Sequence, residues 1–401
     1  MYLKQANSLL SEPTGLLRVL PQGAIEQSNI KLSLIIPTYQ ESQNIEILIQ
    51  RLTQLLDRAI PDRYELIVID DNSPDQTWQF ALNLSLRYPQ LRVMRRQTQR
   101  GLSSAVIRGW QVARGDVLGV IDADLQHPPE TLISLWENIN AGADLAVASR
   151  HVNQGGVSDW SLTRRLLSRG AQVLGLIVLP GVLGCVSDPM SGYFMLRRDA
   201  IAGRTLSPKG YKILIEVLGR GDIRFITEVG YIFQERTEGA SKVTWKQYIE
   251  YLQHLLTLRL ALFPIRRFLR FGIVGFSGLF IDLGLFYLLR EQASLGLTRS
   301  AILSTEVAIL NNFLWNDLWT FRDISRKQRG WKKRLKRLLK FNGVCLVGLI
   351  LNVLLVNLLF NLLGINEYFA KLMAIAIVTA WNFWINLKLS WRVTDMGHSQ
   401  R

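Results

Sequence analysis

The chain has 401 residues and a formal net charge of +15 at pH 7, and this length is enough for two domains with separate cores. No nucleic-acid motif accompanies the positive charge, so its distribution points to a membrane surface and not to nucleic acid. The only two cysteines, Cys185 and Cys345, exclude a disulfide framework and a cysteine zinc site, and they fit a reducing compartment.

The first thirty residues contain no signal-peptide core. Charged residues and prolines interrupt this stretch at Glu12, Pro13, Arg18, Pro21 and Glu26. We therefore expect a flexible tail over residues 1–30.

Strands alternate with helices in the stretch that follows. Apolar runs at 32–36, 65–69, 91–94 and 117–121 are separated by amphipathic patterns of helical length. This alternation predicts an α/β fold, with a mostly parallel sheet covered by helices on both faces. Ligands of such sheets bind beyond the carboxyl ends of the strands, where three of these runs present polar residues.

The run 117–121 ends in Asp122-Ala123-Asp124, with Gln126 two residues later. An isolated Asp-x-Asp is more often a solvated turn, but its position at the end of a buried strand favours a ligand site. Mg²⁺ and Mn²⁺ take oxygen ligands, so Asp122, Asp124 and the amide oxygen of Gln126 form a candidate metal site. An ion held there would neutralise a departing diphosphate.

Several longer motifs occur in a fixed order along residues 31–250. They are Ile-Ile-Pro-Thr-Tyr-Gln-Glu at 35–41, Asp-Asp-Asn-Ser-Pro-Asp at 70–75, Gly-Leu-Ser-Ser-Ala-Val-Ile-Arg-Gly at 101–109, Asp-Ala-Asp-Leu-Gln-His-Pro-Pro-Glu at 122–130, Asp-Pro-Met-Ser-Gly-Tyr-Phe at 188–194 and Gly-Ala-Ser-Lys at 239–242. Together they resemble the dolichyl-phosphate mannose synthases, which are inverting family 2 glycosyltransferases with a GT-A fold. The resemblance implies a GT-A domain over residues 31–243.

The resemblance also implies roles for individual residues. Catalytic roles fall on Asp124, Arg150 and Arg236. Contacts to the acceptor phosphate fall on Arg150, Arg164, Ser168 and Arg236, and contacts to the sugar or the acceptor loop on Asp188 and Ser191. Contacts to the nucleotide sugar fall on Pro37, Tyr39, Glu41, Ile69, Asp70, Asp71, Asp122, Ala123, Lys212 and Lys242. Two alternatives stay open: Glu41 and Asp71 could cap the helices that follow them, and Asp188 could simply form an Asp-Pro turn.

The implied reaction moves mannose from GDP-mannose to a polyprenyl monophosphate with inversion, with Mg²⁺ or Mn²⁺ as the cofactor. Because the acceptor phosphate is already ionised at neutral pH, arginine forks that position it are needed more than a general base. UDP-glucose is the alternative donor, since glucose-transferring relatives share the metal and phosphate machinery. Asn72 and Ala240 depart from the commoner family pattern, which bears on fine positioning and not on the reaction.

The sequence changes in character from residue 268 onward. Apolar stretches at 271–289, 301–321, 341–363 and 369–387 each approach the ~20 residues that a helix needs to cross a bilayer. A basic run without an acidic residue, 326–337, separates the second stretch from the third. Because short basic loops stay in the cytoplasm, we expect four crossings and a cytoplasmic catalytic domain, with lipid headgroups beside the basic run.

This part of the chain resembles the GtrA-like membrane domain that some family members carry. The expected plan is therefore amphipathic interface helices over 244–267, a GtrA-like domain of four helices over 268–392 and a C-terminal tail over 393–401. Periodicity leaves open whether 244–261 lies on the membrane surface or packs on the core.

Polar residues within the first two apolar stretches must face other helices or water. Whether they carry transport or only hold the bundle together stays open for Asp282, Glu306, Asn311, Asn312, Asn316 and Asp317. We recognise no internal repeat. A flippase for lipid-linked sugars with an accessory soluble domain is an alternative function, and the sequence leaves the oligomeric state open, a homo-oligomer included.

Overall fold

The computed structural model describes residues 19–20, 29–157, 162–207, 210–234 and 245–392. The chain divides into two compact units, Met1–Leu262 and Phe263–Arg401. Each unit has a hydrophobic core of its own.

A seven-stranded sheet forms the centre of the first unit, with the strand order β3-β2-β1-β4-β7-β5-β8. Only β7 runs antiparallel to its neighbours, so the predicted mostly parallel sheet is confirmed. A small second sheet pairs β6 with β9. The strands span β1 Leu32–Thr38, β2 Tyr64–Asp70, β3 Leu91–Arg95, β4 Val117–Val120, β5 Leu145–Ser149, β6 Gly156–Val157, β7 Phe194–Arg197, β8 Ile226–Gly230 and β9 Ile232–Phe233.

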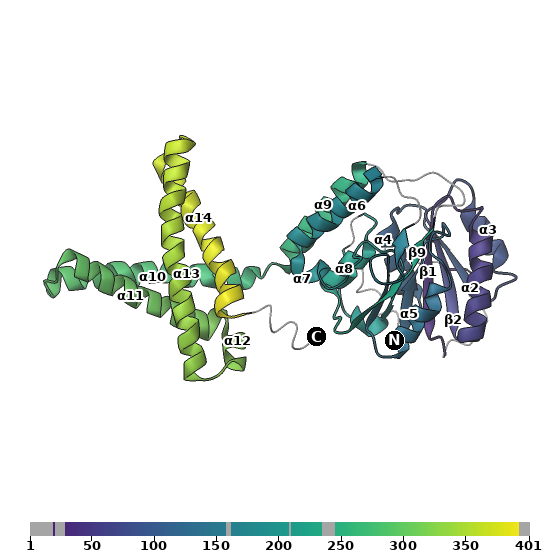
Figure 1. Ribbon diagram of the computed structural model, residues 1–401, viewed down its shortest axis with the longest axis horizontal. Coiled ribbons are helices and arrows are strands. Elements are labelled where there is room, and N and C mark those ends of the chain that lie inside the picture. The colour runs from purple at the N-terminus through teal and green to yellow at the C-terminus, as the bar shows by residue number, and fades with distance from the viewer. Residues whose placement is uncertain (1–18, 21–28, 158–161, 208–209, 235–244, 393–401) are drawn as a thin grey trace. The chain divides into compact units, whose positions relative to one another are not determined.

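Helices cover both faces of this sheet (Figure 1). Alternate residues of β1 enter two different cores: Ile35 packs with α4, whereas Leu34 and Ile36 pack with α2 and α5. The helices of this unit span α2 Ile45–Ala59, α3 Thr77–Leu84, α4 Leu102–Val112, α5 Thr131–Asn140, α6 Leu162–Val178, α7 Pro180–Leu183, α8 Ile213–Arg220 and α9 Trp245–Leu262, with a short 3₁₀ helix at Arg198–Ala200.

Two described residues of the N-terminal stretch pack on the domain, although we predicted a flexible tail there. Leu20 forms an antiparallel bridge with Val93 of β3, through backbone hydrogen bonds of 2.9 and 2.7 Å. Val19 is buried in the core. The tail thus covers part of the open edge of β3, which would otherwise offer unpaired backbone groups.

Helix α9 has two apolar faces. One face packs on the core through Tyr251, Leu255 and Leu258, and the Tyr251 hydroxyl donates to the carbonyl of Ala171 in α6 at 2.8 Å. The other face leaves Leu256 and Leu260 exposed. One face of α9 therefore packs on the core. Contact of the other face with the membrane surface stays a prediction.

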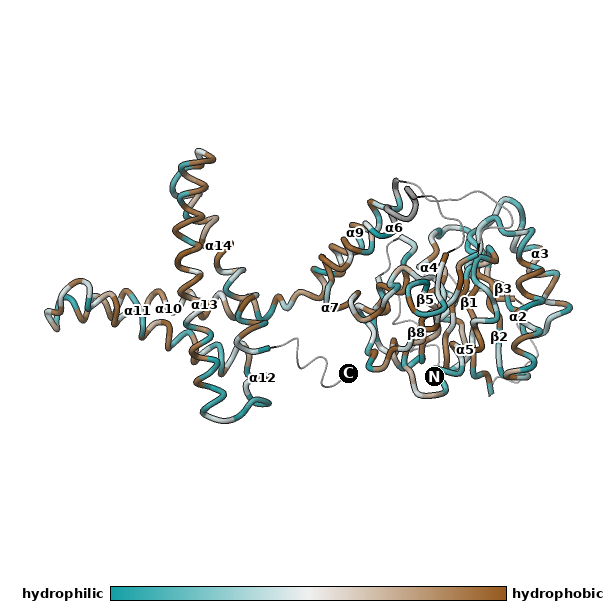
Figure 2. The backbone as a smooth tube through the Cα atoms, in the orientation of Figure 1, coloured by the Kyte–Doolittle hydropathy of each residue, from teal (hydrophilic) through white to brown (hydrophobic). Residues whose placement is uncertain are grey.

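The second unit consists of two helical hairpins, and most of its helices end in a π-helical turn. The first hairpin is α10 Ile265–Tyr287 followed by α11 Leu297–Trp315, and the second is α13 Trp331–Asn357 followed by α14 Glu367–Ile385, with the short α12 Arg322–Lys327 between them (Figures 1 and 2). The π turns span η2 Leu288–Gln292, η3 Asn316–Thr320, η4 Leu358–Leu362 and η5 Asn386–Ser390. Three helices of the described chain are long and apolar enough to cross a membrane: Ile265–Gln292, Trp331–Leu362 and Glu367–Ser390.

The two hairpins repeat each other at a constant separation of 70 residues, which we did not recognise in the sequence. A side chain on Gly278 would meet the amide of Asn312 at 2.4 Å, and one on Gly348 would meet that of Asn382 at the same distance. The core of this unit contains equivalent positions of both repeats: Phe271 and Phe341, Phe313 and Phe383, and Phe321 and Trp391. The second unit is therefore an internally duplicated hairpin joined by an aromatic cluster.

Candidate active site

Three loops leave the carboxyl ends of β1, β2 and β4 and meet at one edge of the sheet. Each loop contains residues in a left-handed backbone conformation: Gln40 with φ of 57° after β1, Asn72 with 56° and Gln76 with 60° after β2, and Leu125 with 59° after β4. This conformation is unfavourable for residues other than glycine, and it collects at functional sites when the surrounding structure enforces it.

The Asp122-Ala123-Asp124 motif lies directly after β4, in a loop that Leu125 bends back. The Asp124 carboxylate is almost buried and accepts the backbone N–H of Gln126 at 3.2 Å. The Gln126 amide donates to the carbonyl of Gln234 at 2.9 Å, and Gln234 N–H donates back to Gln126 at 3.0 Å. The candidate ligand side chains are thus held in place by the loop and by the strand end beyond β9.

The chemistry of this donor set fits a hard divalent cation. Asp122, Asp124 and Gln126 offer carboxylate and amide oxygens and no sulfur or imidazole. Within the described chain no three His, Cys, Asp or Glu side chains form a metal-binding group. A cation at this loop would therefore need further oxygen ligands from a bound substrate.

The Asp-Pro-Met-Ser-Gly loop passes against the Asp122 carboxylate. A side-chain carbon built on Gly192 would lie 3.0 Å from Asp122 Oδ2. With a larger residue here, that carboxylate would have to move by a few tenths of an ångström. Two motifs that are about 70 residues apart in the chain therefore share one site.

Arg150 and Asp188 form a bidentate ion pair in this site. Arg150 donates from Nε to Asp188 Oδ2 at 2.7 Å and from Nη2 to Oδ1 at 2.8 Å, and both side chains are nearly buried. Burial would raise the pKa of Asp188, but the hydrogen bonds and the charge of Arg150 outweigh it and hold that pKa below its ordinary value. Asp188 thus fixes the direction of the Arg150 guanidinium. Ser191 supports the same loop, since its hydroxyl bonds to the backbone of Tyr193 at 3.2 Å.

Lys212 adds a second positive charge next to this pair. Its Nζ donates to the carbonyl of Met190 at 2.8 Å. Burial and the charge of Arg150 lower the pKa of Lys212 to about 8, while the carboxylates of Asp188 and Asp122 oppose the shift. Asp122, Asp188, Arg150 and Lys212 therefore form one group of mutually interacting charges.

His127 lies at the back of the site and received no role from the sequence. It is buried among Tyr193, Tyr231 and Phe233, with ring centroids 5.3 to 5.5 Å away. Burial lowers the pKa of His127 to about 4, so the ring is neutral at neutral pH. Its place in the Asp-Ala-Asp-Leu-Gln-His motif was the only available signal, whereas nothing in the sequence marked Tyr231.

The two carboxylates at the end of β2 have partners within the protein. Asp70 is fully buried and accepts the hydroxyl of Thr38 at 3.0 Å and that of Ser73 at 2.5 Å. Asp71 forms an ion pair with Arg96 and accepts the Gly101 N–H at 2.7 Å, at the start of α4 and not of the helix that follows it. Burial raises the pKa of Asp71, and Arg96 opposes this only in part. These bonds fix the loops that follow β1 and β2.

The remaining candidate residues near β1 and β2 contact neighbouring residues of the fold. Glu41 accepts the side-chain amide of Asn44 at 2.9 Å, at the first turn of α2. Pro37 and Ile69 lie side by side in the register of β1 and β2, and Ala123 is buried. Arg236 and Lys242 lie outside the described residues, as do the side chains of Arg164 and Ser168.

A pocket of about 620 Å³ opens at the same edge of the sheet. Its walls include Tyr39 and Trp78, with Arg95 stacked 4.0 Å from the Trp78 ring centre and Arg100 placed 5.6 Å from that of Tyr39. Arg95 also donates to Asn72 at 2.8 Å. Aromatic rings and arginine forks together suit a planar base with attached phosphates.

Comparison with known proteins agrees with both halves of this description. Residues 33–201 match the model of glycosyl transferase family 2, and residues 270–391 match that of the GtrA/DPMS transmembrane domain. The dolichol-phosphate mannosyltransferase of Pyrococcus furiosus is 42% identical over 364 residues, which are 90% of this chain and 99% of that protein. The chain belongs to the dolichol-phosphate mannosyltransferase family.

Two further proteins are similar to a shorter part of the chain. The dolichol-phosphate mannosyltransferase of Saccharomyces cerevisiae is 37% identical over 239 residues, covering 57% of this chain and 87% of that protein. Among solved structures, glucosyl-3-phosphoglycerate synthase of Mycobacterium tuberculosis is 20% identical with a TM-score of 0.43, covering 62% and 86% of the two chains. The family models and the Pyrococcus furiosus relative confirm the predicted family, and the mostly parallel sheet confirms the predicted fold class. The protein is a membrane-associated glycosyltransferase.

Proposed function

We propose that this glycosyltransferase moves mannose from GDP-mannose to a polyprenyl monophosphate and forms polyprenyl phosphate β-mannose at the cytoplasmic membrane face. The observation that carries the proposal is the 42% identity along 99% of a protein named dolichol-phosphate mannosyltransferase. The site supports it because carboxylates that suit a metal and basic groups that suit a phosphate lie together.

The metal in this proposal is Mg²⁺ or Mn²⁺, held by Asp122, Asp124 and the amide oxygen of Gln126. When bound, it would neutralise the diphosphate of the departing GDP. The pocket with Tyr39, Trp78 and Arg95 would hold the nucleotide next to it. Pro37, Glu41, Ile69, Asp70, Asp71 and Ala123 would shape that nucleotide site through the loops described above.

The acceptor side of the proposal rests on Arg150 and Lys212. Arg150, fixed by Asp188, would grip the acceptor phosphate, and Lys212 would add charge within the same group. Arg164, Ser168, Arg236 and Lys242 complete the proposed phosphate contacts, and Ser191 supports the loop. Because the phosphate oxygen is already ionised, the protein needs to position it and not to deprotonate it.

One displacement then accounts for inversion. An oxygen of the acceptor phosphate attacks the anomeric carbon of mannose, the new carbon–oxygen bond forms, and the bond from that carbon to GDP breaks. The α-linked donor gives a β-linked product, and GDP leaves with the bonding electrons. No protein nucleophile is required.

A direct assay tests this proposal. The purified full chain is incubated with a short polyprenyl phosphate, Mg²⁺ or Mn²⁺, and either labelled GDP-mannose or labelled UDP-glucose. We expect labelled lipid only from GDP-mannose, loss of product with a chelator, recovery with added metal, and cleavage of the product by a β-specific mannosidase. Product from UDP-glucose alone would assign the protein to glucosyl transfer. Absence of product from both donors, combined with movement of a lipid-linked sugar across vesicles, would favour a flippase.

A further inference from the structure

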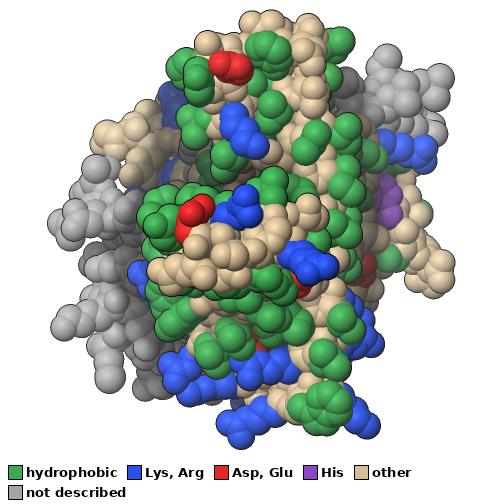
Figure 3. All heavy atoms as spheres, turned by 90° about the vertical axis from the view of Figure 1, so that its left-hand side faces the viewer, with side chains coloured by type: hydrophobic (Ala, Val, Ile, Leu, Met, Phe, Trp, Pro, Cys, Tyr) green, Lys and Arg blue, Asp and Glu red, His purple; other side chains and the backbone are tan. Residues whose placement is uncertain are grey.

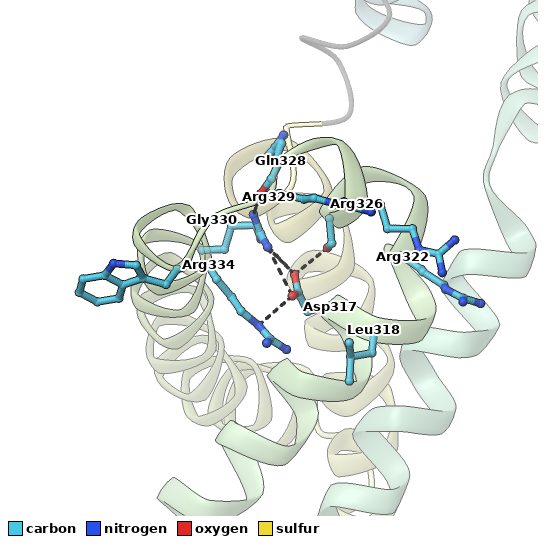
Figure 4. Close-up of a pocket in the computed structure, with 11 residues that line it drawn as sticks. Asp317, Leu318, Arg322, Arg326, Gln328, Arg329, Gly330 and Arg334 are labelled. Atoms are coloured by element: carbon cyan, nitrogen blue, oxygen red, sulfur yellow. Dashed lines mark hydrogen bonds and ion pairs between the residues drawn. The ribbon is translucent and has the colours of Figure 1, made fainter.

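The second unit contains a cavity of about 590 Å³ at the end of the first hairpin (Figure 4). Its wall carries five arginines and a single carboxylate: Arg322, Arg326, Arg329, Arg334, Arg337 and Asp317. They come from η3, from α12 and its following loop, and from the first two turns of α13. We call these six residues the basic pocket.

Asp317 organises one side of the basic pocket. Its nearly buried carboxylate accepts Arg337 Nε at 3.0 Å, the Ser325 hydroxyl at 2.6 Å and the Trp391 indole N–H at 3.2 Å, and it lies 3.1 Å from Arg334 Nε. It thereby fixes two guanidinium groups from α13. Figure 4 marks the contacts of Asp317 with the other residues of the cavity wall as dashed lines.

The other three arginines of the basic pocket are not neutralised. Arg322, Arg326 and Arg329 are exposed, and in the part of the chain that the structure describes they have no ion pair. A cavity that carries several positive charges and one fully engaged carboxylate favours an anionic ligand. Arginine forks match the geometry of phosphate oxygens.

The two repeats differ in residue type at the position of this carboxylate. Residue 387 occupies the position of Asp317 in the second repeat, and it is a buried leucine. Placing a charge at such a position is costly in desolvation compared with an apolar residue of similar size. Besides the Ser325 hydroxyl and the buried Trp391 indole, the partners that offset this cost at Asp317 are the two arginines that it positions.

The surroundings of the basic pocket indicate a lipid source for the anion. Trp331 and Leu318 also line the cavity and are exposed, at 71% and 56% of their full surface. Figure 3 shows Lys and Arg side chains gathered at one edge of a largely apolar face. Tryptophan and basic residues at the end of apolar helices are typical of the zone where headgroups lie.

We propose that the basic pocket binds the phosphate of a membrane lipid headgroup. Arg322, Arg326 and Arg329 contact the phosphate oxygens, Arg334 and Arg337 are held beside them by Asp317, and Trp331 and Leu318 face the first carbons of the acyl region. This site belongs to the membrane domain alone, so it does not depend on the sugar-transfer reaction.

Native mass spectrometry of the delipidated full chain tests the proposal. Phosphatidic acid and a diacylglycerol with the same acyl chains are titrated separately, because the pair differs only in the phosphate. We expect phosphatidic acid to be retained and diacylglycerol to be lost. R326Q/R329Q should weaken retention of phosphatidic acid by about tenfold or more, since two charge-assisted hydrogen bonds to the phosphate are lost.

The matched control is K332Q/K333Q, which removes the same charge from neighbouring exposed residues that do not line the cavity. It should weaken retention by no more than about twofold. Equal losses in both variants would reduce the site to diffuse attraction and overturn the proposal. Equal retention of diacylglycerol would do the same, as would inorganic phosphate binding as tightly as phosphatidic acid, because the source would then be a soluble anion.

Discussion

The Arg150–Asp188 pair is the residue-scale feature on which acceptor binding would depend. We expect D188N to lower kcat/KM for the acceptor by about 10²-fold, because the neutral amide cannot hold both guanidinium nitrogens and a lost charged hydrogen bond is worth about 2–3 kcal/mol. The measurement is mannosyl transfer at varied polyprenyl phosphate. D116N is the control, since Asp116 pairs with Lys31 on the surface and is 67% exposed. Unchanged kinetics in D188N would contradict the proposal that Arg150, held by Asp188, binds the acceptor phosphate.

Lys212 gives the reaction a predicted pH dependence. Its lowered pKa of about 8 means that it carries its charge below pH 8 and loses it as the pH rises through that value. If this charge helps to bind the acceptor phosphate, kcat/KM should fall on the alkaline side with an apparent pKa near 8. K212R keeps its charge throughout, so the alkaline fall should disappear. An identical pH profile in both proteins would show that another group titrates.

Residue identities were easier to predict than residue partners. The sequence marked Asp122, Asp124 and Arg150 because they stand in long motifs. It did not show that Asp188 orients Arg150 or that Gly192 lies against Asp122, because these contacts depend on how β7 and its preceding loop insert between β4 and β5. Trp78, Arg95 and Arg100 were missed because single aromatic and basic residues carry no spacing signal.

At the scale of elements, the contact between the Gly192 loop and the β4 loop makes a sharp prediction. In G192A the new methyl group would lie about 3.0 Å from Asp122 Oδ2, so the carboxylate has to move by a few tenths of an ångström. We expect the concentration of Mn²⁺ for half-maximal activity to rise about tenfold with little change in melting temperature. G156A is the matched control, because a methyl group there meets nothing within 4 Å. A normal metal dependence in G192A would show that the Gly192 loop does not influence metal binding at the β4 loop.

The duplicated hairpin predicts paired effects of equivalent substitutions. G278A and G348A each place a carbon 2.4 Å from an asparagine amide of the facing helix, so both should destabilise the second unit by about 1–3 kcal/mol. G284A has open space and should be neutral. Thermal unfolding of the full chain in detergent measures all three. A stable G278A beside an unstable G348A would argue against equivalent packing in the two repeats.

The periodicity of the sequence predicted where strands and helices lie along the chain, but not which of them pack side by side. The apolar runs at 32–36 and 65–69 fall inside β1 and β2, since buried strands read as continuous apolar segments. The antiparallel strand β7 was not foreseen because a strand's composition does not state its partner. The repeat escaped recognition because leucine-rich helices match one another by chance, and only positions such as Asn312 and Asn382 distinguish it.

At the scale of the whole molecule, the repeat bears on the number of membrane crossings. Helix α11 with η3 carries Glu306 and Asp317, and it is not among the three helices of the described chain that are long and apolar enough to cross a membrane. Its counterpart α14 is one of those three. Because each repeat is a hairpin of two helices, and both helices of the second repeat are long and apolar enough to cross, we predict that α11 also crosses, which gives four crossings in all.

Single cysteines in a chain without Cys185 and Cys345 test this prediction by labelling with an impermeant thiol reagent. Q292C and L362C occupy equivalent exposed positions at the two hairpin tips, and K333C lies in the basic segment between the hairpins. Four crossings place both tips on one side of the membrane and residue 333 on the other, whereas three crossings without α11 place residues 292 and 333 together and residue 362 opposite. Labelling of Q292C and L362C from the same side, with K333C labelled only in inverted vesicles, is the expected result. Because the basic segment should face the cytoplasm, that result would also put the basic pocket at the cytoplasmic leaflet.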